Sequence, residues 1–233
     1  MGDDAPLAIF SSKPHHLSNY FKQRFAQVTN PPIDPLREGI VMSLEMTIGK
    51  KHSINKADEI GARLIHLDSP FLNAKKMDYL LSLSSPENGG FANAVLSTRY
   101  DLELGPSGLE AAVDKLCEDA VAAVVNGVEV LVLSDKPDAE NTLSASTYIP
   151  PNLAVGAVHH ALIKARVRMN TGIIIETGGA WTTHHFASLI GYGAHAVYPY
   201  LAIESTKQWY ELDVTAKKMA AGKVRMLCCV VLC

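Results

Sequence analysis

The sequence predicts an α/β protein: a parallel sheet built from βαβ units with flanking helices, preceded by an N-terminal helical arm. From residue 94 onward, short apolar runs alternate with stretches whose apolar residues recur at helical spacing. One run, Val128–Leu133, is apolar throughout, as in strands that are buried between two layers of helices. Strands separated by helices pair in parallel through right-handed crossovers, so this alternation predicts the sheet.

The helical arm is predicted from a proline-rich segment. Pro31 and Pro32 disfavour regular structure up to Asp34, because proline fixes its own φ and restricts the residue before it. Asp34 can cap a helix that has Pro35 at its first position, where a missing N–H costs nothing. Apolar residues continue at helical spacing as far as Ile48, so we expect the helix to extend to that residue.

The other elements follow from apolar patterns and from the turn residues between them. Ser107 and Glu110 form a capping box, and Gly193 is expected to end a helix. The turn-rich segment 84–90 is the best internal boundary, which gives the divisions 1–88, 89–204 and 205–233. The expected strands are Leu7–Phe10, Arg63–Leu67, Ala94–Ser97, Val128–Leu133, Gly172–Glu176 and Ala194–Val197. The expected helices are Leu17–Ala26, Lys75–Leu83, Ser107–Val125, Asn152–Arg166, Thr182–Ile190 and a tail helix from about Ala202 to Met219.

Composition argues against several classes of protein. The net charge is −3 and the basic residues are dispersed among acids, so no nucleic-acid surface is expected. No run approaches the roughly 18 apolar residues of a membrane span, and no signal peptide is recognised. Cys117 lies in an apolar helical pattern, and the other three cysteines fall in the last six residues without a metal-site spacing. A reducing, intracellular location (cytoplasm or plastid) is therefore expected.

Two pairs of adjacent histidines raise the possibility of a metal site. They are His159-His160 and His184-His185. Neighbours on a helix point about 100° apart, so both members of a pair cannot face one ion. No carboxylate stands at ligand spacing beside either pair, which favours packing or capping roles at helix ends over metal binding. An independent enzyme that uses these histidines remains a third hypothesis.

A ligand crevice is possible where the strands end. Glu176 closes one strand, and Gly178 and Gly179 follow it before a helix begins, so backbone N–H groups there could hold a phosphate. Asp135 follows the preceding strand, and ligands of α/β sheets bind at the carboxyl ends of strands. The alternative is that the glycines only turn the chain and the carboxylates face solvent. The sequence leaves both open.

Several long segments carry a family resemblance. They read TNPPIDPLREGIVMSLE from Thr29, LSDKPDAE from Leu133, IPPNLAVGAVHHALI from Ile149 and HHFASLIGYGAHAVYPYLAIES from His184. With the opening MGDDAPLA, they resemble the central domain of the large subunit of glutamate synthase. The resemblance extends from Met1 to about Lys223.

The resemblance implies a domain that lies between catalytic partners. Glutamate synthases make two glutamates from glutamine and 2-oxoglutarate. An amidotransferase domain frees ammonia, which travels through an internal tunnel. A later domain carries flavin mononucleotide (FMN) and a 3Fe-4S cluster, reduced by ferredoxin or NAD(P)H. The central domain shapes the tunnel and positions its neighbours, so this segment is expected to have no catalytic residue, metal or bound cofactor.

By the same resemblance, four residues would lie at a joint between domains or along the ammonia path: Asn30, Asp34, Arg37 and Glu38. The resulting hypothesis is the central structural domain of a glutamate synthase, in a truncated chain that is inactive alone. The alternative is a free-standing α/β module that binds phosphate or a small acid in the crevice of Asp135 and Glu176.

Overall fold

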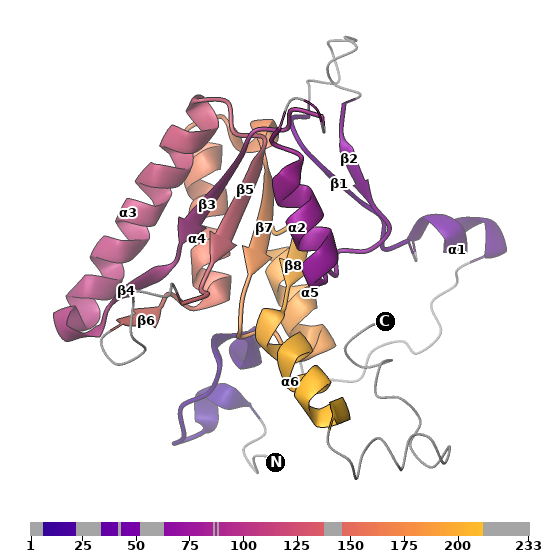
Figure 1. Cartoon of the computed structure of the whole chain (residues 1–233). Helices are drawn as coiled ribbons and strands as arrows, with labels where there is room; N and C mark the ends of the chain where they lie inside the picture. The colour runs from indigo at the N-terminus through magenta and orange to yellow at the C-terminus, as the bar shows by residue number, and fades with distance from the viewer. Residues whose placement is uncertain are drawn as a thin grey trace.

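The computed structural model describes residues 7–21, 34–41, 43–51, 63–85, 87, 89–137 and 146–211. A four-stranded parallel sheet lies at its centre, in the order β3-β5-β7-β8 (Figure 1). Its strands are β3 (Asn93–Ser97), β5 (Val130–Ser134), β7 (Gly172–Glu176) and β8 (Ala196–Tyr198). Consecutive strands are joined by α3 (Gly105–Val125), α4 (Pro151–Lys164) and α5 (Thr183–Gly191). The predicted α/β class is confirmed.

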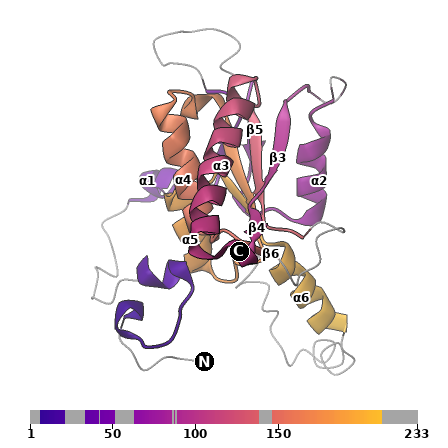
Figure 2. The same cartoon turned by 90° about the vertical axis from the view of Figure 1, so that its left-hand side faces the viewer.

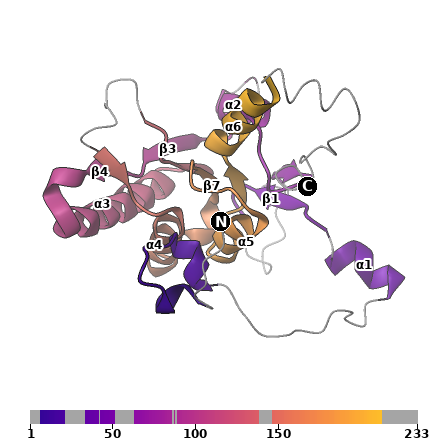
Figure 3. The same ribbon diagram turned by 90° about the horizontal axis from the view of Figure 1, so that it is seen from below.

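The strands stand in the sheet in chain order, which decides where the helices lie. Successive right-handed crossovers in one direction place every connecting helix on the same face. Accordingly, α3, α4 and α5 cover one face (Figures 2 and 3). Alternate residues of the central strands point to opposite faces. Those facing the three helices are Leu131, Leu133, Ile173 and Ile175, whereas Val130, Val132 and Ile174 face the other side.

The second face of the sheet is covered by residues from the N-terminal part of the chain. α2 (Ala74–Ser82) packs there together with an antiparallel pair, β1 (Met46–Ile48) and β2 (Ile65–Leu67). The segment between β2 and α2 also extends the sheet, because Leu72 N donates to Val197 O (2.9 Å) and Val197 N to Pro70 O (2.8 Å). This face therefore has a hydrophobic core of its own.

The first elements differ from expectation. The predicted strand Leu7–Phe10 is wrong: Phe10 N donates to Leu7 O (3.1 Å) and residues Ala8–Phe10 form a 3₁₀ turn, η1. A strand needs a neighbour to pair with, and none lies beside this segment in the described part of the chain. The predicted helix Leu17–Ala26 is seen as a 3₁₀ helix, η2 (Leu17–Phe21), and its remainder lies outside the described residues.

The proline-led helix is shorter than predicted. α1 spans Pro35–Val41, and Asp34 Oδ1 accepts from Arg37 N (2.9 Å), which confirms the predicted cap. The extension to Ile48 is wrong, because that residue ends β1. Ile48 is fully buried against Gly172, where a Cβ would collide with it, so tertiary packing overrides the helical spacing.

The remaining elements agree with the sequence except at three places. α3 has no side-chain cap, since Ser107 lies inside the helix and its Oγ donates to Leu104 O (3.0 Å); the capping box is wrong. An antiparallel pair, β4 (Arg99–Asp101) and β6 (Ser146–Tyr148), was not predicted. Short 3₁₀ turns, η5 (Leu102–Leu104) and η6 (Arg168–Asn170), were also missed.

The last described element, α6 (Tyr200–Glu211), confirms the start of the tail helix, and the part expected to reach Met219 lies outside the described residues. Within the ranges that the structure describes, no helix is both long and apolar enough to cross a membrane.

Three helices, α3, α4 and α5, end in the same hydrogen-bonded turn, and at α3 the left-handed residue is Gly127. After α5, Gly193 N donates to Ile190 O (2.9 Å) and Ala194 N to Leu189 O (3.1 Å), a Schellman motif that confirms Gly193 as the helix stop. α4 ends with the equivalent pair of bonds, but its left-handed position is held by Arg166 at φ 60°. Glycine adopts this conformation at low cost and arginine does not.

We expect Arg166→Gly to raise the free energy of unfolding by about 0.5–1 kcal/mol, because it relieves the left-handed backbone at an exposed site. Gly193→Ala should lower it by more than about 1 kcal/mol, since φ is 116° and the new Cβ would overlap the His159 ring. Urea denaturation measures both. Arg166→Ala is the control: a stabilisation equal to that of Arg166→Gly would show that the backbone is not the cause.

Candidate functional site

The two predicted carboxylates meet at one edge of the sheet. β5 and β7 pair in register, with Ser134 opposite Glu176, so the residues that end these strands are neighbours. Asp135 N donates to Glu176 O (3.1 Å). The side chains are buried, because Asp135 is 4% exposed and Glu176 is 9% exposed. The structure therefore brings together two residues whose proximity the sequence alone could not establish.

Hydrogen bonds from the loop after β7 surround the Asp135 carboxylate. Thr177 Oγ1 donates to Oδ2 (2.5 Å), and Gly178 N lies 3.0 and 3.1 Å from the two carboxylate oxygens. The Tyr200 hydroxyl lies beside this loop, 3.1 Å from where a Cβ at Gly178 would stand. The next N–H of the loop, from Gly179, donates to Thr177 Oγ1 (3.0 Å). Both glycine N–H groups are thus engaged by side chains of the protein.

Glu176 and Arg99 complete this network. Glu176 Oε2 accepts from Ser134 Oγ (2.6 Å). Arg99 Nη1 donates to Asp135 O (3.2 Å), and its other donors bind Ser146, which ties the β4–β6 pair to the strand ends. We call these residues the strand-end network: Arg99, Ser134, Asp135, Glu176, Thr177, Gly178 and Tyr200.

The electrostatics of the network follow from its burial. Burial raises the pKa of Asp135, and the hydrogen bonds from Thr177 and Gly178 act in the opposite direction. Burial also raises the pKa of Tyr200, and the neighbouring charges of Asp135 and Glu176 add to that shift. The two carboxylates of Asp135 and Glu176 outnumber the one guanidinium of Arg99. Hydrogen-bond donors and cations are therefore favoured over anions as ligands at this edge. A phosphate at the glycine loop would have to displace Asp135.

The N-terminal segment packs over the same loop. A Cβ at Gly179 would lie 3.2 Å from His16 Nε2 and 3.3 Å from Pro151 Cγ. The His16 ring stacks on His185, with ring centroids 4.9 Å apart. His184 Nε2 donates to Ser18 O (2.7 Å). The second histidine pair therefore attaches η2 to the start of α5.

The first histidine pair also makes packing contacts within the protein. His159 Nδ1 accepts from Arg168 Nε (2.9 Å), and its ring meets His160 edge to face. Burial lowers the pKa of His159, and the charge of Arg168 lowers it further. In the described ranges, no three His, Cys, Asp or Glu side chains gather in a group that could hold a metal ion.

The interface candidates lie apart from the strand-end network. Asp34 caps α1 and Arg37 lies within it, and this helix stands away from the sheet beyond β1 (Figures 1 and 3). Leu36 on this helix is 88% exposed. Asn30 lies outside the described residues, and the Glu38 side chain is not described. The roles of all four residues stay a prediction, as do those of Asp135, Glu176, Gly178 and Gly179.

Four members of the network were not singled out from the sequence: Ser134, Thr177, Arg99 and Tyr200. A usable signal existed for three of them. Ser134 and Thr177 adjoin the predicted carboxylates, and Tyr200 closely follows the next strand, β8. The carboxyl ends of parallel neighbours share one edge of a sheet, so such residues converge. Arg99 had no comparable signal, because the β4–β6 pair was not foreseen.

The fold and this edge define a parallel α/β domain whose strand ends are closed by its own side chains. Comparison with known families identifies the kind of domain. The family model described as the glutamate synthase central domain matches residues 1–227, and the chain belongs to that family. The match extends slightly beyond Lys223, where the resemblance was expected to end.

Curated relatives agree with the family. The chain is 49% identical over 224 residues to ferredoxin-dependent glutamate synthase 2 of Synechocystis sp.. It is 49% identical over 226 residues to the chloroplastic ferredoxin-dependent glutamate synthase of Oryza sativa subsp. japonica, and 44% over 224 residues to the enzyme of Pyropia yezoensis. Each match covers 96% of this chain but only 14% of the relative, so the chain spans about one-seventh of their length.

Asp135→Ala should lower the free energy of unfolding by about 2–4 kcal/mol, because it leaves the Thr177 hydroxyl and the Gly178 N–H without their acceptor inside the protein. Urea denaturation with a fluorescence readout measures the change. Asp119→Ala, at an exposed position of α3, is the matched control and should leave stability within about 0.5 kcal/mol. Equal effects of the two variants would contradict a structural role for the network.

Asp135 should also give a defined pH dependence. Its folded-state pKa is raised above the unfolded value of about 3.9, so the folded state binds this proton more tightly. The stabilisation that comes from tighter proton binding by folded Asp135 is fully present below about pH 4. It is lost as the pH rises through the folded-state pKa. The unfolding free energy of the wild type minus that of Asp135→Asn should therefore fall as the pH rises from 4 to 7. A difference that rises would reverse the assigned sign.

Proposed function

We propose that this chain acts as the central, scaffolding domain of a ferredoxin-dependent glutamate synthase. The observation that carries the proposal is the family match over residues 1–227. The relatives at 44–49% identity are named as ferredoxin-dependent enzymes, and the chain spans 14% of their length. In this proposal, the chain joins the amidotransferase and FMN-binding domains and lines part of the ammonia path between them.

The parent reaction would convert glutamine and 2-oxoglutarate, with electrons from ferredoxin, into two glutamates. We propose that this segment supplies no catalytic group and has no turnover alone. The strand-end network supports this, because the Asp135 carboxylate and both glycine N–H groups are engaged by neighbours within the domain. Positioning and stability, rather than chemistry, are what these groups provide.

The described residues do not fit the cofactors of the proposed parent enzyme. A 3Fe-4S cluster needs several cysteine thiolates, and Cys117 is the only cysteine in the described part of the chain. An FMN phosphate would need free backbone donors, whereas Gly178 N and Gly179 N already donate to side chains. We therefore assign both groups to other domains of the enzyme and route no step through this one.

An exposed apolar surface supports contacts with neighbouring domains. Leu36 projects from α1 without cover from the described residues. Large apolar side chains are also exposed near η1 and η5, namely Ile9, Phe10, Leu102 and Leu104. Exposed apolar side chains grouped on protruding segments are typical of interaction surfaces. We propose that Asp34, Arg37 and Glu38, on or next to α1, lie at such an interface, with Asn30 on the segment that leads to it.

The alternative is a free-standing module that binds phosphate or a small acid at the strand ends. Anion binding there would compete with Asp135 for the N–H of Gly178 and would place the anion beside Glu176. Like charges in a buried site repel each other strongly. We therefore prefer the scaffolding role.

The proposal predicts that the purified chain, mixed with glutamine, 2-oxoglutarate and reduced ferredoxin, forms no glutamate. A chimera tests whether this segment is needed for coupled glutamate synthesis. In it, residues 1–227 replace the matching segment of the Synechocystis enzyme, and glutamate formation should be retained. A deletion of that segment should abolish coupled activity. Turnover by the isolated chain, or a chimera as inactive as the deletion, would overturn the proposal.

The same chimera tests the interface on α1. Leu36→Ser should raise the number of glutamines hydrolysed per glutamate formed, because a loosened joint lets ammonia escape. Val125→Ser, at a comparably exposed apolar position (66%) at the end of α3, is the matched control and should keep the ratio unchanged. Equal ratios in both variants would remove α1 from the ammonia path.

A further inference from the structure

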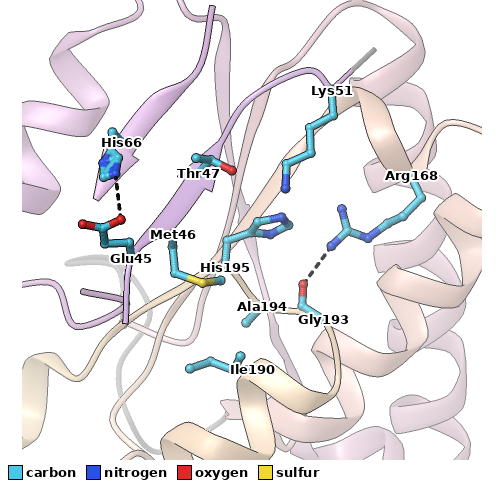
Figure 4. A pocket seen from close by; sticks show the side chains of 10 residues that line it. All are labelled: Glu45, Met46, Thr47, Lys51, His66, Arg168, Ile190, Gly193, Ala194 and His195. Carbon is cyan, nitrogen blue, oxygen red and sulfur yellow. Dashed lines mark hydrogen bonds and ion pairs between the residues drawn. The ribbon is translucent and has the colours of Figure 1, made fainter. Parts of the chain in front are cut away.

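A cavity lies at the opposite edge of the sheet from the strand-end network. It has a volume of about 500 Å³ and opens between β1, η6 and the turn from α5 into β8 (Figure 4). Lys51, Arg168 and His195 bring nitrogen atoms to one side of it, and Met46 and Ile190 supply apolar wall. None of these residues takes part in the network around Asp135.

Lys51 is placed at the cavity by its backbone. Lys51 N donates to Met169 O (2.7 Å), which joins the chain after β1 to η6. Its ammonium points toward the His195 ring (Figure 4). Within the described ranges, no carboxylate forms an ion pair with Lys51. A half-buried cation without a counter-ion favours an anion nearby.

Arg168 is held rigidly beside Lys51. Its guanidinium donates to His159 Nδ1 (2.9 Å), Thr171 O (2.9 Å) and Gly193 O (2.8 Å). These bonds use three of its five N–H groups and leave two. All three acceptors are uncharged, and no acidic side chain of the described part pairs with Arg168. Its full positive charge is therefore available to a ligand.

His195 adds a neutral donor. Its Nδ1 accepts from Ile173 N (3.1 Å), which places the ring proton on Nε2. Burial lowers the pKa of His195 to about 4, and the charges of Arg168 and Lys51 contribute to that shift. The imidazole is therefore uncharged at neutral pH and offers an N–H donor next to two cations.

From this arrangement we infer a binding site for a small oxyanion, a carboxylate or a phosphate group, held by Lys51, Arg168 and the Nε2–H of His195. The cavity volume suits an acid of metabolite size. Glu45, the acidic residue that lines the cavity, lies near His66 (3.7 Å) and away from Lys51 (Figure 4). The inference concerns a different edge from the scaffolding proposal and does not depend on it.

Isothermal titration calorimetry of the full chain tests the inference, with inorganic phosphate and succinate as separate probes at constant ionic strength. Saturable one-to-one binding of either probe is expected. A preference between them identifies a phosphoryl or a carboxylate ligand. Lys51→Met should weaken binding by at least about tenfold, because one charge-assisted hydrogen bond is lost.

Lys50→Met is the matched control, since Lys50 adjoins Lys51 in the chain but has an exposed side chain that does not line the cavity. It should change affinity less than about twofold, which separates a specific contact from general charge attraction. Thermal denaturation of both variants checks that each is folded. The inference fails if the wild type binds neither probe at millimolar concentration, or if the two variants weaken binding equally. Phosphate binding that survives Lys51→Met would place the anion elsewhere and would also overturn it.

Discussion

The order of the strands in the parallel sheet is the constraint on which the rest of the structure depends. Because β3, β5, β7 and β8 follow one another in space as they do in sequence, their connecting helices all lie on one face. The opposite face carries Val130, Val132 and Ile174 and must be covered by other residues. That cover comes from β1, β2 and α2, so the N-terminal part completes the α/β body.

The two edges of the sheet have opposite electrostatic character. At the carboxyl ends, Asp135 and Glu176 are buried and satisfied by hydrogen bonds from the protein. At the amino ends, Lys51 and Arg168 face a cavity with no acidic partner among the described residues. Buried polar groups stabilise a fold when their partners are present and cost free energy when they are not. One edge is therefore internally complete, while the other is suited to receive an anion.

Sequence patterns predicted much of this fold. The parallel strands, α2 to α5 and the Gly193 helix stop were foreseen, because local periodicity and turn chemistry agree with the tertiary structure there. Predictions failed where residues distant in sequence determine the local structure. Ile48 joins a strand because β2 and Gly172 lie beside it, and the β4–β6 pair depends on contacts across nearly fifty residues.

The sites also divide into features that local sequence patterns predict and features that depend on the tertiary structure. Asp135 and Glu176 were recognised from their positions at strand ends, yet their proximity needed the strand order. Lys51, Arg168 and His195 come from three separate turns, and no spacing in the sequence brings them together. Convergence of this kind is set by topology rather than by local pattern.

The cover on the second face also has a consequence for biosynthesis. α2 and its neighbours are made early, but the strand residues they pack against, such as Val132 and Ile174, are separated from them by about fifty to a hundred residues in the chain. Until β8 leaves the ribosome, the apolar side of α2 with Met77 and Leu80 lacks its complete partner. Such long-range closure slows folding and exposes nascent intermediates to aggregation. Chaperone contact during translation is therefore most valuable over this early segment.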